Sequence, residues 1–366
     1  MKSNSTLDAI NSNFLKAKLI YPTDKLISYS RNYFEHRNYI VDSKGIESAR
    51  ISILNNYSLP LDQLNNILLT ASTSESYLNI LTNISDGGEI LFPSPAYPLF
   101  EYISKYSKSN FAYYNLLDKY QNFDFKSLIS KISKNTKAIV IITPNNPTGS
   151  IIKISELKKI EKICIDKKIK LIIDTVFDIF NFSDIPNITP NDIGGELEVF
   201  WLNGISKMFA LPDLKLAWIY YQNPNETLLD NLETFNDTFL NANYLSQTIL
   251  PDIFENSQNF QKKMIDRLTK NIEIVKQINS NFFKSSPPQG GIHFICSLIS
   301  TNKFITTDIE FSDHLERYCQ LLAHPLSFYE YTSEKPSVVM TILQTENNMN
   351  EIVNRINNFA TEYLSQ

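Results

Sequence analysis

Short runs of aliphatic and β-branched residues recur along the chain, and they constrain its fold more than any other feature. Residues 137–143 (KAIVIIT) and 169–174 (IKLIID) are apolar at most positions, which is typical of strands buried on both faces. Runs of the same kind occupy residues 67–70, 89–92, 199–202 and 216–221, and the run at 89–92 ends at a proline.

Segments of helical pattern lie before and between these runs, for example at residues 46–57 and 75–84. Buried strands that alternate with helices predict a mostly parallel sheet covered on both faces. We therefore expect an α/β fold: a three-layer α/β/α large domain with a mostly parallel sheet, plus a smaller α+β domain.

The C-terminal part of the chain has a different pattern. Residues 244–278 read as one helix that crosses between domains, residues 290–298 and 337–343 as strands of the smaller domain, and residues 349–363 as a closing amphipathic helix. The expected division is 1–44 for an N-terminal arm and part of the small domain, 45–250 for the large domain, and 251–366 for the interdomain helix and C-terminal small domain.

Composition excludes several classes of protein. The chain has 366 residues, of which 43% are hydrophobic, a formal net charge of −5 and a pI of about 5.5, so neither nucleic acid nor an anionic membrane is an expected partner. It has no apolar run long enough to span a bilayer and no secretory signal at its start. Cys164, Cys296 and Cys319 lack metal-ligand spacing and indicate a reducing cytoplasm.

Polar residues follow the ends of several predicted strands, where open α/β sheets bind their ligands. Ser72, Thr73 and Ser74 lie between the run at 67–70 and the next helix. Hydroxyls and free amides at a helix N-terminus form an anion site. The alternative is an ordinary helix cap made by Ser72 or Thr73.

Two proline-rich turns come after the next strands. Pro93-Ser-Pro-Ala-Tyr97-Pro could hold Tyr97 against a flat ring, although a tyrosine at such a position is often only a packing residue. Pro144-Asn-Asn146-Pro-Thr-Gly149 contains an Asn-Pro bond, a candidate for the cis form. This turn would fix the Asn146 amide so that it donates to a ligand.

Asp174 ends the apolar run at 169–174. A buried carboxylate at this position requires a cationic partner, and a protonated pyridine nitrogen would serve. The alternative is a helix cap for the following turn.

The segment from Asn203 to Trp218 places Lys207 directly after Ser206 and a second cation, Lys215, eight residues on. A lysine amine forms a Schiff base with a carbonyl cofactor, and the hydroxyl and the second cation suit a phosphate. A lysine that binds an aldehyde beside a phosphate site is the chemistry of pyridoxal 5′-phosphate.

Taken together, the turn at 146–149, Asp174 and the Ser206-Lys207 pair resemble the class I/II aminotransferases, a family of fold-type I pyridoxal-phosphate enzymes, with some similarity to histidinol-phosphate and aromatic aminotransferases. The resemblance covers the chain from about Gly45 to its C-terminus. It implies a homodimer with active sites at the subunit interface.

The resemblance also implies a role for each matching residue. Lys207 would be the catalytic Schiff-base lysine and would move the proton between the substrate α-carbon and the cofactor. Asp174 would pair with the pyridinium nitrogen, Asn146 would bind the ring phenolate, and Tyr97 would stack on the ring. The phosphate would be held by Ser72, Thr73, Ser74, Ser206 and Lys215, and by Tyr39 of the neighbouring subunit.

The chain departs from the family pattern at two of the cofactor positions. Lys215 replaces the usual arginine and loses its planar two-bond grip on phosphate, which predicts weaker cofactor retention. Phe177 replaces a tyrosine that donates to the phenolate, which predicts a raised pKa for the Schiff base.

The third departure concerns the substrate. The family grips the α-carboxylate with an arginine on the strand before the last helix, but here that strand has Val339 or Met340 at the matching position. An unpaired carboxylate buried there would cost several kcal/mol, as an order of magnitude. Either the substrate lacks a free α-carboxylate or another cation holds it, with Lys335, Arg31 and Arg37 as the candidates.

The sequence therefore predicts a pyridoxal-phosphate aminotransferase that transfers an amino group between an amino acid or amine donor and a keto or aldehyde acceptor. A lyase, cyclase or decarboxylase on the same fold is the first alternative, and a non-catalytic binding protein is the second. A dinucleotide-binding fold is excluded because no Gly-x-Gly-x-x-Gly follows the first strands.

Overall fold

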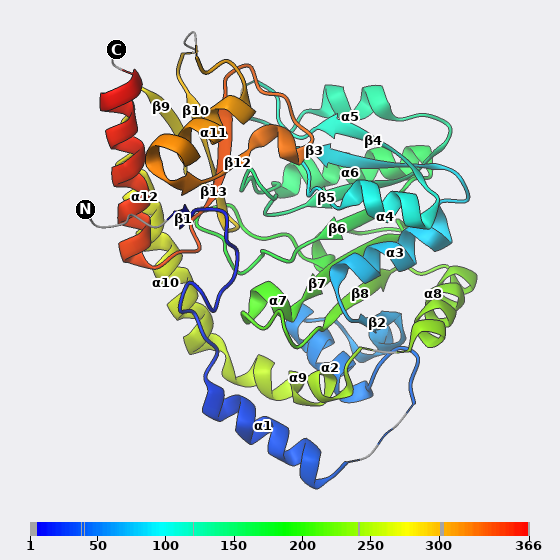
Figure 1. The fold of residues 1–366 in the computed structure, drawn as a ribbon. Helices are drawn as coiled ribbons and strands as arrows, with labels where there is room; N and C mark the ends of the chain where they lie inside the picture. The colour runs from blue at the N-terminus through cyan, green and yellow to red at the C-terminus, as the bar shows by residue number, and fades with distance from the viewer. Residues whose placement is uncertain are drawn as a thin grey trace.

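The computed structural model describes residues 6–37, 39, 41–119, 121–240, 242–300 and 304–364. Figure 1 shows a broad sheet flanked by helices and a smaller sheet beside it, on the side of the two termini. No helix in these ranges is both long enough and apolar enough to cross a membrane.

The large sheet has seven strands in the order β2-β8-β7-β6-β5-β3-β4. Neighbours from β7 to β4 are parallel, whereas β8 runs antiparallel to both β7 and β2. The strands are β2 (Ile67–Thr70), β3 (Glu89–Ser94), β4 (Asn110–Asn115), β5 (Thr136–Ile142), β6 (Lys170–Asp174), β7 (Val199–Gly204) and β8 (Ala217–Gln222).

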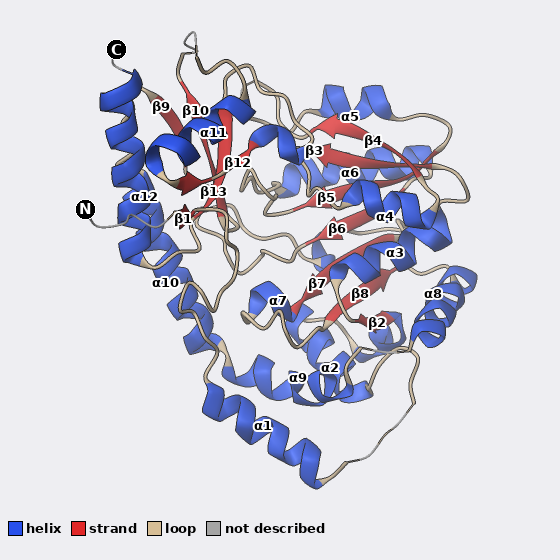
Figure 2. Ribbon diagram, in the orientation of Figure 1, coloured by secondary structure: helices blue, strands red, loops and turns tan. Residues whose placement is uncertain are grey.

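Helices cover both faces of this sheet, as Figure 2 shows. They include α2 (Glu47–Tyr57), α3 (Thr73–Ile84), α4 (Phe100–Ser107), α5 (Phe125–Lys131), α6 (Ile154–Lys167) and α8 (Glu226–Phe239). Alternate residues of a strand point to opposite faces, so in β5 Val140 belongs to the core cluster that includes α3 and α4, while Ile139 and Ile141 belong to the cluster that includes α6. The expected three-layer α/β/α domain is confirmed.

The small sheet is antiparallel, in the order β12-β13-β10-β9. Phe294, Cys296, Val338 and Met340 belong to the same core cluster as the helices beside this sheet. The elements here are β9 (Phe283–Ser286), β10 (His293–Leu298), α11 (Asp308–Cys319), β12 (His324–Pro325), β13 (Ser337–Thr341) and α12 (Glu346–Phe359), with β1 (Leu7–Asp8) parallel to β11 (Leu321–Leu322).

The expectation of one helix over 244–278 is wrong. Two helices occupy this region, α9 (Tyr244–Asn256) and α10 (Gln258–Val275), and Ser257 separates them. The Ser257 hydroxyl bonds the carbonyl of Ile253, four residues earlier, and lies 2.9 Å from the Tyr21 hydroxyl. A serine that bonds back to the preceding turn competes with helix continuation, and Tyr21 holds it in that position.

The backbones of the two domains meet closely near the loop that contains Asn146. The amide of Gly290 donates to the carbonyl of Gly149 at 2.9 Å, and the amide of Gly291 donates to the carbonyl of Phe180 at 2.8 Å. A Cβ on Gly149 would lie 2.3 Å from the Cβ of Pro288, so only glycine permits this approach. We call this contact the glycine clasp.

Candidate active site

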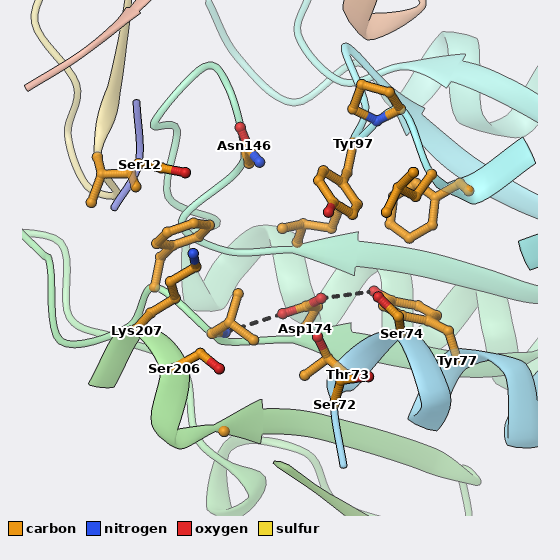
Figure 3. A pocket seen from close by; sticks show the side chains of 18 of the residues that line it. Ser12, Ser72, Thr73, Ser74, Tyr77, Tyr97, Asn146, Asp174, Ser206 and Lys207 are labelled. Carbon is orange, nitrogen blue, oxygen red and sulfur yellow. Dashed lines mark hydrogen bonds between the residues drawn. The ribbon is translucent and has the colours of Figure 1, made fainter. Parts of the chain in front are cut away.

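A cavity of about 520 Å³ opens at the carboxyl ends of β5, β6 and β7 (Figure 3). This is the edge at which open α/β sheets bind ligands. Every residue that the sequence analysis singled out for the cofactor lines it except Tyr39. They are Ser72, Thr73, Ser74, Tyr97, Asn146, Asp174, Phe177, Ser206, Lys207 and Lys215.

Lys207 lies on the short helix α7 (Ile205–Met208), which begins where β7 ends. A Cβ on Gly204 would lie 2.9 Å from the Cβ of Ala217, so glycine lets this turn pack directly on β8. The pKa of the Lys207 amine is lowered, mainly by desolvation and further by the charge of Lys215. The amine is therefore more readily uncharged, as a nucleophile must be.

Asp174 is the last residue of β6 and is buried. One carboxylate oxygen accepts the amide of Val176 at 3.1 Å, as in the cap alternative, and the other accepts the hydroxyl of Tyr77 at 3.1 Å (Figure 3). Burial raises its pKa to about 6, and no ion pair in the described part of the chain includes it. A buried carboxylate of this kind favours a cationic ligand.

Tyr77 was missed by the sequence analysis. It lies one turn after Thr73 in α3, and residues four apart share a helix face. That spacing was the available signal, because it places Tyr77 on the same side of the helix as the predicted phosphate site. Its partner on β6 could not be read from the sequence.

The N-terminus of α3 bears out the cap alternative without excluding an anion site. Ser72 is the N-cap, and its hydroxyl oxygen accepts the amide of Glu75 at 3.2 Å. Its O–H and the hydroxyls and amides of Thr73 and Ser74 are still available to donate to an anion. Lys215 has a left-handed backbone, with φ of 51°, and adds a positive charge to the cavity lining.

The turn that contains Asn146 has the cis bond that the sequence suggested, between Asn146 and Pro147. The side-chain oxygen of Asn146 is buried and has no hydrogen-bond partner among the described residues. Phe177, also buried, presents no hydroxyl to the cavity. Asn146 therefore presents an amide on this side of the cavity, and position 177 adds no phenol. The family resemblance implies both groups.

These features fit pyridoxal phosphate. The cavity combines a desolvated amine at Lys207, a buried carboxylate at Asp174 that lacks a cation, and hydroxyls at the α3 N-terminus. Such a set would meet the aldehyde, the ring nitrogen and the phosphate of that cofactor, respectively. No group of His, Cys, Asp and Glu in the described ranges could hold a metal ion.

Tyr39 lies away from the cavity and is 73% exposed, with its ring centroid 5.8 Å from that of Tyr244. An exposed position is compatible with a contact to another subunit, and that contact stays a prediction. The proposed substitutes for the missing arginine do not line the cavity either. These are Lys335, Arg31 and Arg37.

Residues from distant parts of the chain complete the cavity. Ser12 comes from the N-terminal segment, and His293, His324, Phe328 and Tyr329 come from the small domain. Phe328 and Tyr329 line the cavity, while Tyr331 packs against the cluster formed by Leu326, Tyr329 and Val339.

With this geometry, the chain can be compared with known proteins. Residues 24–356 match the family described as aminotransferase class I and II. The chain belongs to this family, whose members depend on pyridoxal phosphate, so the expected family and cofactor are confirmed.

Individual relatives carry several aminotransferase names. The chain is similar to tyrosine aminotransferase of Dictyostelium discoideum, with 25% identity over 73% of this chain and 65% of the relative. It is 30% identical to alanine aminotransferase of Mycobacterium tuberculosis, over 50% of this chain and 44% of the relative. The matched regions thus span about half to two thirds of such relatives.

Solved structures share the whole fold. Alanine aminotransferase from Pyrococcus furiosus superposes with a TM-score of 0.89 at 21% identity, covering 99% of this chain and 93% of that one. Tyrosine aminotransferase from Leishmania infantum gives a TM-score of 0.89 at 18% identity, covering 98% and 92%. At these identities the likeness establishes the fold, and the reaction must be argued from the site.

Proposed function

We propose that this protein is a pyridoxal-phosphate-dependent aminotransferase that moves an amino group between an amino donor and a keto or aldehyde acceptor. The observation that carries the proposal is the presence of Lys207 and Asp174 in one cavity: a partly buried, desolvated amine and a buried carboxylate, neither of which has an ion-pair partner in the described structure. When bound, the cofactor supplies an aldehyde for amines and a ring that withdraws electrons.

The protein's own side chains would transfer the proton and hold the cofactor in place. The Lys207 amine, with its lowered pKa, can take a proton from a bound substrate at Nζ and return it to a neighbouring atom. Asp174 would hold a positive charge at the far side of the ring, and Tyr77 would fix the carboxylate in place. Asn146 and Tyr97 would orient the ring, and the α3 hydroxyls with Ser206 and Lys215 would bind the phosphate.

The test begins with cofactor loading. Purified protein incubated with pyridoxal phosphate is expected to gain visible absorbance, and borohydride reduction followed by peptide mass spectrometry is expected to place the cofactor on Lys207. Lys207→Ala should lose both signals and about 10³-fold in amino transfer. Lys276→Ala, a change at an exposed lysine paired with Glu273, should behave as wild type.

Amino donors then separate transamination from the other reactions. Conversion of the bound cofactor to its pyridoxamine form supports transamination. Release of carbon dioxide or of a leaving group without that form would instead identify a decarboxylase, lyase or cyclase. Failure of the cofactor to attach to Lys207 would contradict all of these pyridoxal-phosphate reactions and favour a non-catalytic binding protein.

We further propose a homodimer in the cytoplasm, with the chain divided at about residues 45 and 250. Large apolar side chains are exposed on and near α1 (Thr23–Glu35), including Ile27, Phe34, Tyr39 and Val41, and such patches are typical of protein interfaces. All three cysteines are free and buried, which suits a reducing compartment. Light scattering of the purified protein tests the dimer.

A further inference from the structure

The cavity has two walls that differ in charge. We call Ser72, Asn146, Asp174, Lys207 and Lys215, together with their neighbours on the large sheet, the cofactor wall. His293, His324, Phe328 and Tyr329 form the small-domain wall. All charged residues of the described lining, Asp174, Lys207 and Lys215, lie on the cofactor wall. Each of them has a cofactor group to bind, so none is left for a charged substrate group.

The two histidines do not supply a cation. Burial, with smaller contributions from the nearby Lys207 and His324, lowers the pKa of His293 to about 3. Burial also lowers the pKa of His324, against an opposing effect of Asp8. Both imidazoles are therefore neutral near pH 7, where they donate and accept hydrogen bonds without carrying charge.

His324 and Tyr329 together always keep one donor for a ligand. The Nδ1 atom of His324 lies 3.1 Å from the Tyr329 hydroxyl. If Nδ1 accepts from the hydroxyl, Nε2 carries the ring proton. If Nδ1 donates, the hydroxyl proton is free instead. The ring of His293 takes part in none of the hydrogen bonds of the described residues, so it too is available.

The strand β13, which lies between the strands of His324 and His293, cannot supply the missing positive charge. His324 pairs with Val339, and Val339 pairs with Ile295 on the other side, two residues along β10 from His293. This register puts both histidines and Val339 on one face of the small sheet. Val339 is fully buried against Leu326 and Tyr329.

The rest of the opening is apolar and accessible. Phe328 is 48% exposed, Leu99 41% and Tyr97 38%, although all of them line the cavity. Apolar rims of this kind bind the uncharged part of a ligand and allow it to extend into solvent. A bulky group attached beyond the reacting centre would therefore not be excluded.

We propose that the small-domain wall is a subsite for an uncharged acyl group, so that the amino substrate is an ester, thioester or amide of an amino acid and not the free acid. The acyl oxygen accepts from the His324–Tyr329 pair or from His293. A free carboxylate would lose its water there and gain no cation. This inference rests on the proposed pyridoxal-phosphate function and names its substrate class.

Matched ligands test it. The holoenzyme is titrated with alanine, leucine and phenylalanine, each as the free acid, the methyl ester, the amide and the N-acetylcysteamine thioester, and binding is followed through the absorbance of the bound cofactor. Concentrations are expressed as unprotonated amine, because esters and acids differ in amine pKa. We expect at least one uncharged series to bind at least 10-fold more tightly than its acid.

Equal or tighter binding of the free acids overturns the proposal, as does a lack of response to every uncharged compound. These outcomes are distinct from failure of the proposed function, which appears earlier as absence of cofactor on Lys207. An enzyme that binds the acids through a cation of another subunit would give the first of the contradicting results.

Two variants locate the effect. Tyr329→Phe removes only a hydroxyl and is expected to weaken binding of the uncharged compounds about 10-fold without changing cofactor affinity. Tyr331→Phe, beside Val339 but outside the cavity, is the matched control and should change neither. Unaltered binding in Tyr329→Phe overturns the assignment of this pair.

Val339→Arg adds a guanidinium between the histidine strands. It should shift the preference toward free acids by at least 10-fold, whereas Val339→Leu should not. If Val339→Arg does not fold, the comparison of Tyr329→Phe with Tyr331→Phe still tests the proposal.

Discussion

The cofactor wall and the small-domain wall enclose the same cavity but differ in how they are built. The cofactor wall has three charged residues of the large domain: Asp174 ends β6, Lys207 lies in the short helix α7 that follows β7, and Lys215 lies in the loop before β8. The small-domain wall has neutral histidines and aromatic rings, brought together by pairing of β10 and β12 with β13. On the proposed assignments, one cavity keeps the charges that would bind a cofactor but has no charge for a substrate acid.

If the walls are independent, changes on the cofactor wall should alter cofactor affinity and leave the ratio of ester to acid binding unchanged. The largest effect after loss of Lys207 is expected from Asp174→Asn, which should weaken pyridoxal phosphate binding about 100-fold or more, because the ring nitrogen loses its counterion. Absorbance titration measures it. Asp178→Asn, at a partly buried aspartate outside the cavity lining, should stay within about threefold of wild type.

The same variant has an opposite effect on the apoprotein. Burial raises the pKa of Asp174 from 3.8 to about 6, so its charge costs stability that appears as pH rises through this window and persists above it. Without cofactor, Asp174→Asn should therefore be more stable than wild type at pH 8, by on the order of 2 kcal/mol. Below pH 4 the difference should vanish in thermal unfolding, and a difference that persists there would contradict the explanation.

Tyr77→Phe should give the next effect. It removes one of the two donors to Asp174, which lets the pKa of the carboxyl rise further and weakens its hold on a cation. A hydrogen bond to a charged group is worth about 1.5–3 kcal/mol, so cofactor affinity should fall at least 10-fold. An unchanged affinity would show that the bond to Val176 alone positions the carboxylate.

Lys215→Ala should weaken cofactor binding by less, about 3- to 10-fold, because this lysine is exposed and water screens its charge. Lys215→Arg should tighten binding, because guanidinium can make two bonds to phosphate. Titration in low and high salt provides the check, since the advantage of a charge should shrink in salt. No change in either variant would remove Lys215 from the phosphate site.

Phe177→Tyr is expected to have the smallest effect. It restores a phenol where the family has one and should lower the pKa of the lysine-bound cofactor by about one unit through an added donor. A spectral pH titration measures this. A variant with an unchanged pKa would mean that the position 177 side chain does not face the cofactor oxygen.

The two walls also differ in how far the sequence could predict them. Asn146, Asp174 and Lys207 each follow a recognisable apolar strand, so local pattern and spacing are enough to predict that they share one edge of the sheet. The predicted strand bounds also agree closely with the observed ones; for example, the run at residues 67–70 is strand β2. Tyr77 was hidden because its partner lies on a strand nearly a hundred residues away.

The small-domain wall depends on pairings that no local pattern encodes. His324 lies on a strand of two residues, too short for a periodic signal, and its place beside Val339 is fixed only by the register with β13. Ser12 reaches the cavity because β1 pairs with β11 at the other end of the chain. The break at Ser257 was missed for the same reason, since its partner Tyr21 is remote in sequence.

The glycine clasp has a consequence for how such an enzyme can diversify. It ties the loop of Asn146 to the segment that leads into His293, backbone to backbone, with no side chain to trim or enlarge. The clasp therefore restricts how far Asn146, the proposed ligand of the cofactor ring, can move from His293. New substrate specificity would therefore have to arise from side-chain substitutions on the small-domain side of the cavity, at positions such as 324, 329 and 339. The backbone contact between the two domains would stay unchanged.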